Sequence, residues 1–228
     1  NSPMGLFLAN IGENWAVYLN GTPLKSEIHL DKKGWITRYR HMREVLLPLD
    51  SRILRQGKNI LAVRIVADPT NIDSGFHRST PFLIDDYQRL ERKRSEQGAL
   101  ILIFLYLFFG VYHVFIYLRR REEKFNLLYG LFSITLFAYL ITRTHAVYAV
   151  IQDSTVLHRI EYSTLYALLP LVCAFIEVLL ENKTSLFTRA FSVFYGLLIA
   201  ITALPVPNPF AIDILRVWQV TSLAPILY

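Results

Sequence analysis

Three residues in the first half of the chain carry side chains suited to holding a small ligand. Trp35, Tyr39 and Arg40 follow the turn-forming segment Asp31-Lys32-Lys33-Gly34. An aromatic face can stack on the apolar face of a sugar ring, and a guanidinium can hold a carboxylate through two parallel hydrogen bonds. We therefore expect a binding rim for a carbohydrate or a small acid. The alternative is that Trp35 is a core residue of a strand.

A second candidate rim consists of Phe76, His77 and Arg78, which again place an aromatic ring near a guanidinium. Recognisable catalytic motifs are missing, with no G-x-S-x-G, Walker lysine loop, H-E-x-x-H or G-x-G-x-x-G. The six histidines are scattered, and Cys173 is the single cysteine. We therefore expect no catalytic residue, metal or cofactor in this segment.

Two polar residues interrupt apolar stretches of the second half. Glu177 is an intramembrane carboxylate if its stretch is a span, and such a group marks a functional site or a polar pair across helices. Alternatively, Glu177 lies one turn from Glu181 and snorkels near the cytoplasmic interface. His113 is better suited to an interhelical hydrogen bond than to a proton relay.

The composition divides the chain into a polar part and an apolar part. Of 228 residues, 53% are hydrophobic, and the net charge is +6. Residues 1–97 hold 15 of the 24 Lys and Arg residues, although they are the shorter part. The first part therefore resembles a water-soluble domain and the second a membrane region. The positive charge forms no dense block, so nucleic-acid binding is not expected.

The polar part has the pattern of a β-sandwich. Trp15, Val17 and Leu19 share one face at period two, and Asn20-Gly21 suits a tight hairpin turn. Further strands are expected at residues 6–11, at residues 44–49 as an edge strand, because of Pro48, and at residues 59–66. Asp50 or Ser51 could cap one helical turn through Leu54. Residues 1–84 are thus a β domain, and the charged residues 85–97 are a connector.

The apolar part contains segments long enough to cross a bilayer. Gly98 to Leu118 has 21 residues without a formal charge, which at 1.5 Å per residue spans roughly 30 Å. The expected spans are residues 98–118, 126–142, 164–180, 190–204 and an incomplete 217–228. Both ends of the sequence are expected to be cut, so a signal peptide upstream and an output domain beyond Tyr228 could belong to the full protein.

Lys and Arg counts in the short loops predict the orientation. The first and third loops carry six basic residues, and the second and fourth carry three. The β domain is therefore expected outside the cytoplasm, in a multi-pass inner-membrane protein. The basic residues at 89–94 argue the other way, but extended domains translocate largely regardless of charge.

Two sets of residues resemble known families. Residues 14–21, 47–49 and 57–65 (NWAVYLNG, LPL and GKNILAVRI) resemble galactose-binding-like jelly-roll domains of many glycosidases. Residues 106–117 and 125–130 (YLFFGVYHVFIY and FNLLYG) resemble bacterial seven-transmembrane receptors with diverse intracellular signalling modules, except that His113 stands where an asparagine is expected. That family implies an extracytoplasmic β domain, seven helices and a cytoplasmic cyclase, kinase or phosphatase, with no catalytic residues in the first two regions.

The expected function is therefore a transmembrane sensor. Its β domain would bind a ligand, and its helical bundle would pass the signal to the output domain. A homodimer of the protein is one expected assembly. The alternative is a membrane-tethered carbohydrate-binding module or glycosidase-like enzyme. A transporter would show Gly- or Pro-broken helices in repeated halves, whereas here only Pro170 and Pro225 interrupt spans.

Overall fold

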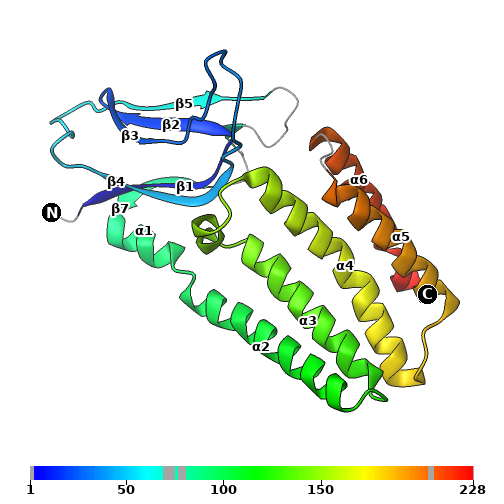
Figure 1. Ribbon diagram of the computed structural model, residues 1–228. Helices are drawn as coiled ribbons and strands as arrows, with labels where there is room; N and C mark the ends of the chain where they lie inside the picture. Colours follow the sequence, from blue (N-terminus) through cyan, green and yellow to red (C-terminus); the bar gives the residue numbers. More distant parts are fainter. Residues whose placement is uncertain (1–2, 69–74, 77–80, 205–207, 228) are drawn as a thin grey trace. The chain divides into compact units, whose positions relative to one another are not determined.

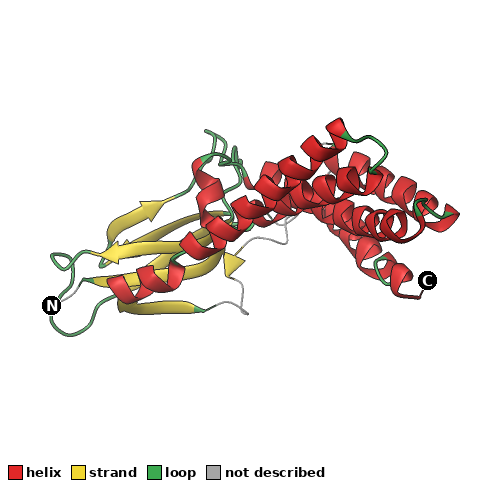
Figure 2. Cartoon of the chain, turned by 90° about the horizontal axis from the view of Figure 1, so that it is seen from below, coloured by secondary structure: helices red, strands yellow, loops and turns green. Residues whose placement is uncertain are grey.

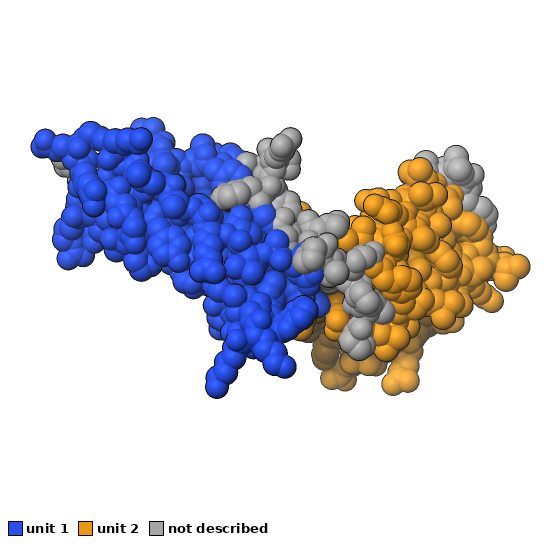
Figure 3. Space-filling model, turned by 90° about the horizontal axis from the view of Figure 1, so that it is seen from above, with its two compact units in different colours: residues 1–96, 144–155 blue, residues 97–143, 156–228 orange. Residues whose placement is uncertain are grey.

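The structure of the chain is a computed structural model, and it describes residues 3–68, 75–76, 81–204 and 208–227. The chain divides into two compact units (Figure 3). Unit 1 comprises Asn1–Glu96 together with Thr144–Thr155, and unit 2 comprises Gln97–Arg143 and Val156–Tyr228. A short segment between two helices therefore belongs to the N-terminal unit, which is not the division that the sequence suggested.

Unit 1 contains two antiparallel sheets (Figure 2). In one sheet β1 lies between β4 on one side and both β6 and β7 on the other, and in the second β2 lies between β3 and β5. The strands are β1 (Met4–Gly12), β2 (Asn14–Leu19), β3 (Thr22–Ser26), β4 (Met42–Leu49), β5 (Leu61–Val66), β6 (Gly75–Phe76) and β7 (Phe82–Asp86). Two sheets followed by apolar helices confirm the expected fold class.

The local patterns explain several of these strands. Asn20 and Gly21 both have positive φ, 51° and 85°, and join β2 to β3 as the predicted hairpin turn. β4 is an edge strand, as Pro48 predicted. The segment after Asp50 forms a single turn, in which Ile53 donates its N–H to the Asp50 carbonyl and the Asp50 carboxylate accepts the Arg52 N–H.

The core of unit 1 lies on the two central strands. The side chains of Leu8, Ile11, Trp15 and Val17 are at most 2% exposed. Residues 85–97, expected as a connector, contain the end of β7, the helix α1 (Tyr87–Arg94) and the start of the next helix. Leu90 of α1 is buried in a cluster with Phe7 and Leu46, so this charged segment adds to the core.

Unit 2 is helical (Figure 1). Among the described residues, four helical stretches are long and apolar enough to cross a membrane: Tyr87–Arg119, Lys124–Thr142, Ser154–Glu181 and Leu186–Ala203. The first includes α1. The helices are α2 (Gln97–Arg119), α3 (Lys124–Thr142), α4 (Ser154–Glu181), α5 (Leu186–Ala203), α6 (Asn208–Thr221) and α7 (Ala224–Leu227), with a 3-10 helix η1 (His145–Ala149) after α3.

Two helices begin earlier in the chain than the predicted spans, because those predictions excluded segments that contain charged residues. The predicted span 164–180 is part of a longer helix that begins at Ser154, and Glu161 within it pairs with Arg143 at 2.6 Å. The predicted span 217–228 is not one helix, because α6 begins at residue 208, ends at Thr221 and is followed by α7. Asp213 and Arg216 interrupt its apolar sequence but form an i,i+3 ion pair on the helix surface.

Glycines allow α2 and α3 to pack closely. A Cβ atom on Gly110 would lie 2.7 Å from the Ile134 side chain and 3.0 Å from the Gly130 carbonyl oxygen. A Cβ atom on Gly130 would lie 2.9 Å from the Gly110 carbonyl oxygen. Such mutual close approach is how small residues let membrane helices associate. The other helices share a core that includes Tyr166 of α4, Tyr195 of α5 and Ile214 of α6.

Candidate ligand site and the loop between α3 and α4

A compact loop presents Trp35 on the surface of unit 1. The Asp31 carboxylate accepts hydrogen bonds of 2.8 Å from the backbone N–H groups of Lys33 and Trp35. Gly34 has a φ of 86°, which suits the turn between them. The Trp35 side chain is 72% exposed, so the alternative of a core tryptophan is wrong. The core tryptophan of the unit is Trp15, which is fully buried.

Trp35 and Tyr39 line one cavity of about 330 Å³. The structure thus brings together two of the three residues that the sequence suggested for the first rim. Its other walls come from the same loop and from the end of β5. The lining residues are Gly34, Trp35, Ile36, Tyr39, Val66, Ala67 and Asp68.

Asp68 is the functional candidate that the sequence did not suggest. The Tyr39 hydroxyl donates a 2.9 Å hydrogen bond to its carboxylate. Burial, the bond to Asp68 and the negative charges of Asp68, Glu13 and Asp153 together raise the pKa of Tyr39 to about 12. Asp68 lies two residues after the end of β5, and that position close to the clearest predicted strand was the signal available in the sequence.

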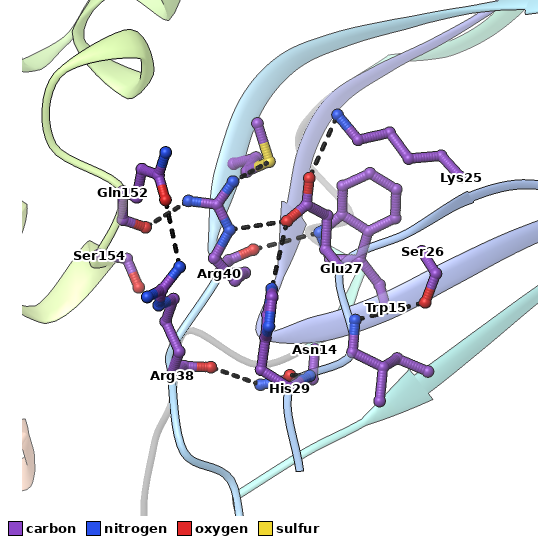
Figure 4. Close-up of polar contacts among 12 residues, drawn as sticks. Asn14, Trp15, Lys25, Ser26, Glu27, His29, Arg38, Arg40, Gln152 and Ser154 are labelled. Carbon is purple, nitrogen blue, oxygen red and sulfur yellow. Dashed lines mark hydrogen bonds and ion pairs between the residues drawn. The ribbon is translucent and has the colours of Figure 1, made fainter.

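Arg40 has a different place from the one expected. Its guanidinium pairs with Glu27 at 2.7 Å, with both side chains nearly buried, and it also donates to the Gln152 carbonyl (Figure 4). Burial alone would raise the pKa of Glu27, but Arg40 and Lys25 outweigh burial and hold that pKa below its usual value. Arg40 is not among the residues that line the cavity.

The second candidate rim is only partly described. Phe76 lies in β6, where its backbone pairs with Ile11 of β1. Arg78 falls outside the described residues. Phe76 is not among the described residues that line the cavity at Trp35.

The loop between α3 and α4 is bonded to the β strands and to the segment before β4. The Ser154 N–H donates to the Tyr39 carbonyl at 3.2 Å. The Arg38 side chain donates to the Gln152 side chain at 3.1 Å (Figure 4). The Tyr148 hydroxyl accepts from the Arg43 N–H at 3.1 Å. These contacts join residues more than a hundred positions apart.

Glu96 and Arg43 also hold the same loop. The carboxylate of Glu96 accepts hydrogen bonds from the backbone N–H groups of His145, at 2.6 Å, and Ala146, at 3.3 Å. The His145 Nδ1 lies 2.9 Å from the Arg43 carbonyl oxygen. Glu96 immediately precedes α2, so the entry to the first long helix and the exit from the second are bonded to each other.

His113 and Glu177, the two polar residues expected within the membrane, have defined partners. The His113 Nδ1 of α2 lies 2.7 Å from the Asn126 Oδ1 of α3, an interhelical contact. Glu177, near the end of α4, accepts hydrogen bonds of 2.7 Å from the Ser185 N–H and the hydroxyls of Ser185 and Thr188. A carboxylate at this position satisfies the exposed N–H and hydroxyl groups at the start of α5.

The comparison with known families decides the identity of the helical region. Residues 97–228, more than half of the chain, match the model of the family described as 7TM diverse intracellular signalling. The chain belongs to this family. The 7TM diverse intracellular signalling match begins where unit 2 begins and includes the loop between α3 and α4. No curated protein and no solved structure gives a match to the chain.

Membership in the 7TM diverse intracellular signalling family makes the chain a multi-pass membrane protein of a signalling type. The two segments of its N-terminal unit are then expected on the same side of the membrane. Residues 1–96 and residues 144–155 are separated by two membrane-crossing helices, α2 and α3. Two crossings return the chain to the side from which it started. The loop and the β strands can therefore form one folded unit.

Proposed function

We propose that this chain is the sensory and transmembrane part of a receptor in the inner membrane. The β unit lies outside the cytoplasm and binds a small ligand in the cavity lined by Trp35, Tyr39 and Asp68. The loop of residues 144–155 passes the effect of binding to α3 and α4. The helices then relay it to a cytoplasmic output domain of the full-length protein.

One observation carries this proposal: Tyr39 contacts both the cavity and the loop. Its hydroxyl bonds to Asp68 in the cavity, and its carbonyl accepts the N–H of Ser154, the first residue of α4. A ligand that moves the Tyr39 ring therefore also acts on the backbone that leads into a long apolar helix. Signalling requires that the ligand bind one arrangement of this loop more tightly than another.

The neighbouring arginines support the same route. Arg38 and Arg40 flank Tyr39, and both donate to Gln152, through its side chain and its carbonyl respectively. Three consecutive residues of the ligand-binding segment thus hold the loop. Hydrogen bonds from charged donors are stronger than neutral ones, so this attachment is firm enough to transmit a displacement.

The cavity lining favours binding over hydrolysis. Glycosidases that use protein carboxylates need a pair of them across the bond that is cleaved. Among the described residues that line this cavity, Asp68 is the one carboxylate. A membrane-tethered glycosidase is therefore the weaker proposal.

The test is hydrogen–deuterium exchange on the whole chain in lipid nanodiscs. A panel of neutral sugars, organic cations and organic acids is first screened for binding, with Trp35→Phe as the comparison. A compound that binds should change amide exchange in residues 144–155, including the N–H of Ser154. Binding that leaves exchange in the loop unchanged contradicts the relay. A wild-type chain that binds nothing in the panel contradicts ligand sensing at this cavity.

A further inference from the structure

Another cavity, of about 340 Å³, lies within unit 2 where two helix connections meet. One connection joins α2 to α3 and the other joins α4 to α5, and Figure 1 shows both at the same end of the unit. Successive membrane crossings by α2, α3, α4 and α5 also bring these two connections to one membrane surface. The cavity therefore lies at the boundary between membrane and water. Its described lining residues are Tyr117, Lys124, Leu127, Leu128, Val178, Asn182, Lys183, Thr184 and Arg189.

The lining of this basic cavity combines three cations with no carboxylate among its described members. Lys124 begins α3, Lys183 lies between α4 and α5, and Arg189 is in the first turn of α5. The Arg189 Nε donates a 3.0 Å hydrogen bond to the Thr184 hydroxyl, which orients the guanidinium. Because α3 and α5 both begin here, the positive ends of two helix dipoles add to the charge of the side chains. The cavity therefore favours an anion.

The acidic residues close in sequence lie outside the described lining of the basic cavity. Glu123 pairs with Arg120 at 3.2 Å. Glu177 accepts its hydrogen bonds from the start of α5. Glu122 and Glu181 are exposed and are not among the described lining residues. An anion in the cavity would thus meet the three cations without a carboxylate in the described lining to repel it.

The apolar part of the lining indicates which anion fits. Leu127 and Leu128 lie about one turn further into α3 than Lys124. Val178 lies in α4, and its side chain is buried. Tyr117, near the end of α2, has the amphipathic ring that is typical of the head-group level of a membrane. Cations at the surface with apolar side chains beneath them match the order of phosphate and acyl chains in a phospholipid.

We propose that the basic cavity binds the phosphate head group of an anionic membrane phospholipid. The side chains of Lys124, Lys183 and Arg189 contact the phosphate oxygens, and an acyl chain lies along the apolar part of the lining. Basic pockets between membrane helices recognise such head groups, and a guanidinium matches the geometry of a phosphate. Because the lining comes from all four long helices, one lipid would hold the two helix connections together. This inference does not depend on the ligand cavity of unit 1.

The probe is dioleoylphosphatidylglycerol, compared with dioleoylphosphatidylcholine, which has the same acyl chains without a net charge. The whole chain in detergent micelles is titrated with each lipid in about 0.15 M ammonium acetate, where charges are screened beyond about 8 Å. Native mass spectrometry counts the lipids bound to each chain. The first phosphatidylglycerol should bind at least about tenfold more tightly than phosphatidylcholine. Equal affinities, or uptake of many phosphatidylglycerol molecules without a tighter first site, overturn the proposal.

Matched variants locate the site, and all of them change exposed side chains. Lys124→Gln, Lys183→Gln and Arg189→Gln should each weaken binding of the first phosphatidylglycerol by about fivefold, because each removes one cation from the phosphate. Arg121→Gln removes the same charge from the α2–α3 connection but lies outside the described lining. It should weaken binding by less than about twofold at this salt concentration. An equal loss in Arg121→Gln would indicate general attraction to a basic surface and overturn the assignment.

Inorganic phosphate tests whether a free anion occupies the basic cavity instead of a lipid. It is titrated calorimetrically into the whole chain in nanodiscs of pure phosphatidylcholine. Without acyl chains to bury, it should show no saturable binding. Saturable binding of phosphate that is lost in Lys183→Gln would assign the cavity to a soluble phosphate and overturn the lipid assignment.

Discussion

The guanidinium of Arg40 lies 2.7 Å from a carboxylate oxygen of Glu27, and the two side chains are only 9% and 12% exposed. Removing water from isolated charges costs several kcal/mol, so each group depends on the other. The same guanidinium donates to the Gln152 carbonyl. A buried ion pair thus fixes the loop of residues 144–155 to the strands of unit 1.

Replacement of Arg40 by alanine should destabilise unit 1 by about 1–3 kcal/mol, because the nearly buried Glu27 would lose its closest charged hydrogen-bond donor and keep Lys25 at 3.2 Å. Arg55→Ala is the matched control, since the Arg55 side chain is exposed and its loss should cost no more than about 0.5 kcal/mol. Amide exchange of β2 and β5 in the nanodisc-embedded chain measures both effects. Similar losses for the two arginines would contradict a structural role specific to Arg40.

The two tryptophans of unit 1 should respond differently to truncation. Trp15 is fully buried and its indole N–H donates to the Arg40 carbonyl, so Trp15→Ala should cost about 3–5 kcal/mol. Trp35→Ala should leave the fold intact because that side chain is 72% exposed. The two variants are compared by thermal unfolding, and amide hydrogen exchange in β1 and β2 provides a second measure of their stability. Unfolding by Trp35→Ala would mean that its ring packs in the core.

Glu44 should make unit 1 less stable as the pH rises from acid to neutral. Burial, followed by the charge and hydrogen bond of Glu96, raises the pKa of Glu44 above 4.5, although Arg94 opposes the shift. Because the folded state holds this proton more tightly, its contribution to stability is complete below pH 4.5 and is lost as the pH rises through the raised pKa. Glu44→Gln keeps a hydrogen-bonding side chain and cannot ionise.

The difference between Glu44→Gln and the wild type isolates that contribution from the other carboxylates. The variant should be the more stable protein at pH 7, and its advantage should shrink as the pH falls toward 4.5. Melting temperatures between these two pH values provide the measurement, with the exposed Glu91→Gln as the control. An advantage that grows on acidification would reverse the assigned direction of the pKa shift.

Local patterns predicted much of the fold. The Asn20-Gly21 turn, the alternation of Leu61, Val63 and Ile65 in β5, and the long apolar helices depend on neighbours in sequence. The position of Arg40 did not follow from its neighbours. Its partner Glu27 comes 13 residues earlier, and its other acceptor at Gln152 lies 112 residues later.

The site was predictable to the same extent. Trp35 and Tyr39 stood out because aromatic residues after a turn are suited to ligand binding. Asp68 becomes part of the site because the fold places it beside Tyr39 after β5. Ser154 contacts Tyr39 because the loop folds onto the strands. Contacts of that range depend on the tertiary fold, which residue spacing does not encode.

A leucine at Gly110 should separate α2 from α3. Even a Cβ atom there would lie 3.0 Å from the Gly130 backbone oxygen, which cannot move aside as a side chain can. Overpacking of this kind costs about 1–3 kcal/mol. Gly196→Leu in α5 is the matched control, because a Cβ atom there has no neighbour within 4 Å. Unfolding of both variants in mixed micelles tests the difference, and equal stability would contradict the close helix contact.

The orientation of the chain can be tested with single cysteines in a Cys173→Ser background. Thr22→Cys lies beside the Gly21 turn, Lys124→Cys begins α3, and Val150→Cys is in the loop that belongs to unit 1. If unit 1 is outside the cytoplasm, a membrane-impermeant maleimide should label positions 22 and 150 in intact spheroplasts. Position 124 should react only after the membrane is breached, because one crossing separates it from unit 1.

Position 150 also tests whether α2 and α3 both cross the membrane. Val150 is 84% exposed, so its cysteine is accessible to the reagent wherever the loop faces water. Because α2 and α3 together cross the bilayer twice, positions 22 and 150 must give the same result in either orientation. Labelling of 124 alone would place unit 1 in the cytoplasm and contradict the proposed receptor topology. Different results at 22 and 150 would mean that α2 and α3 do not both span the membrane, which would also remove the loop from unit 1.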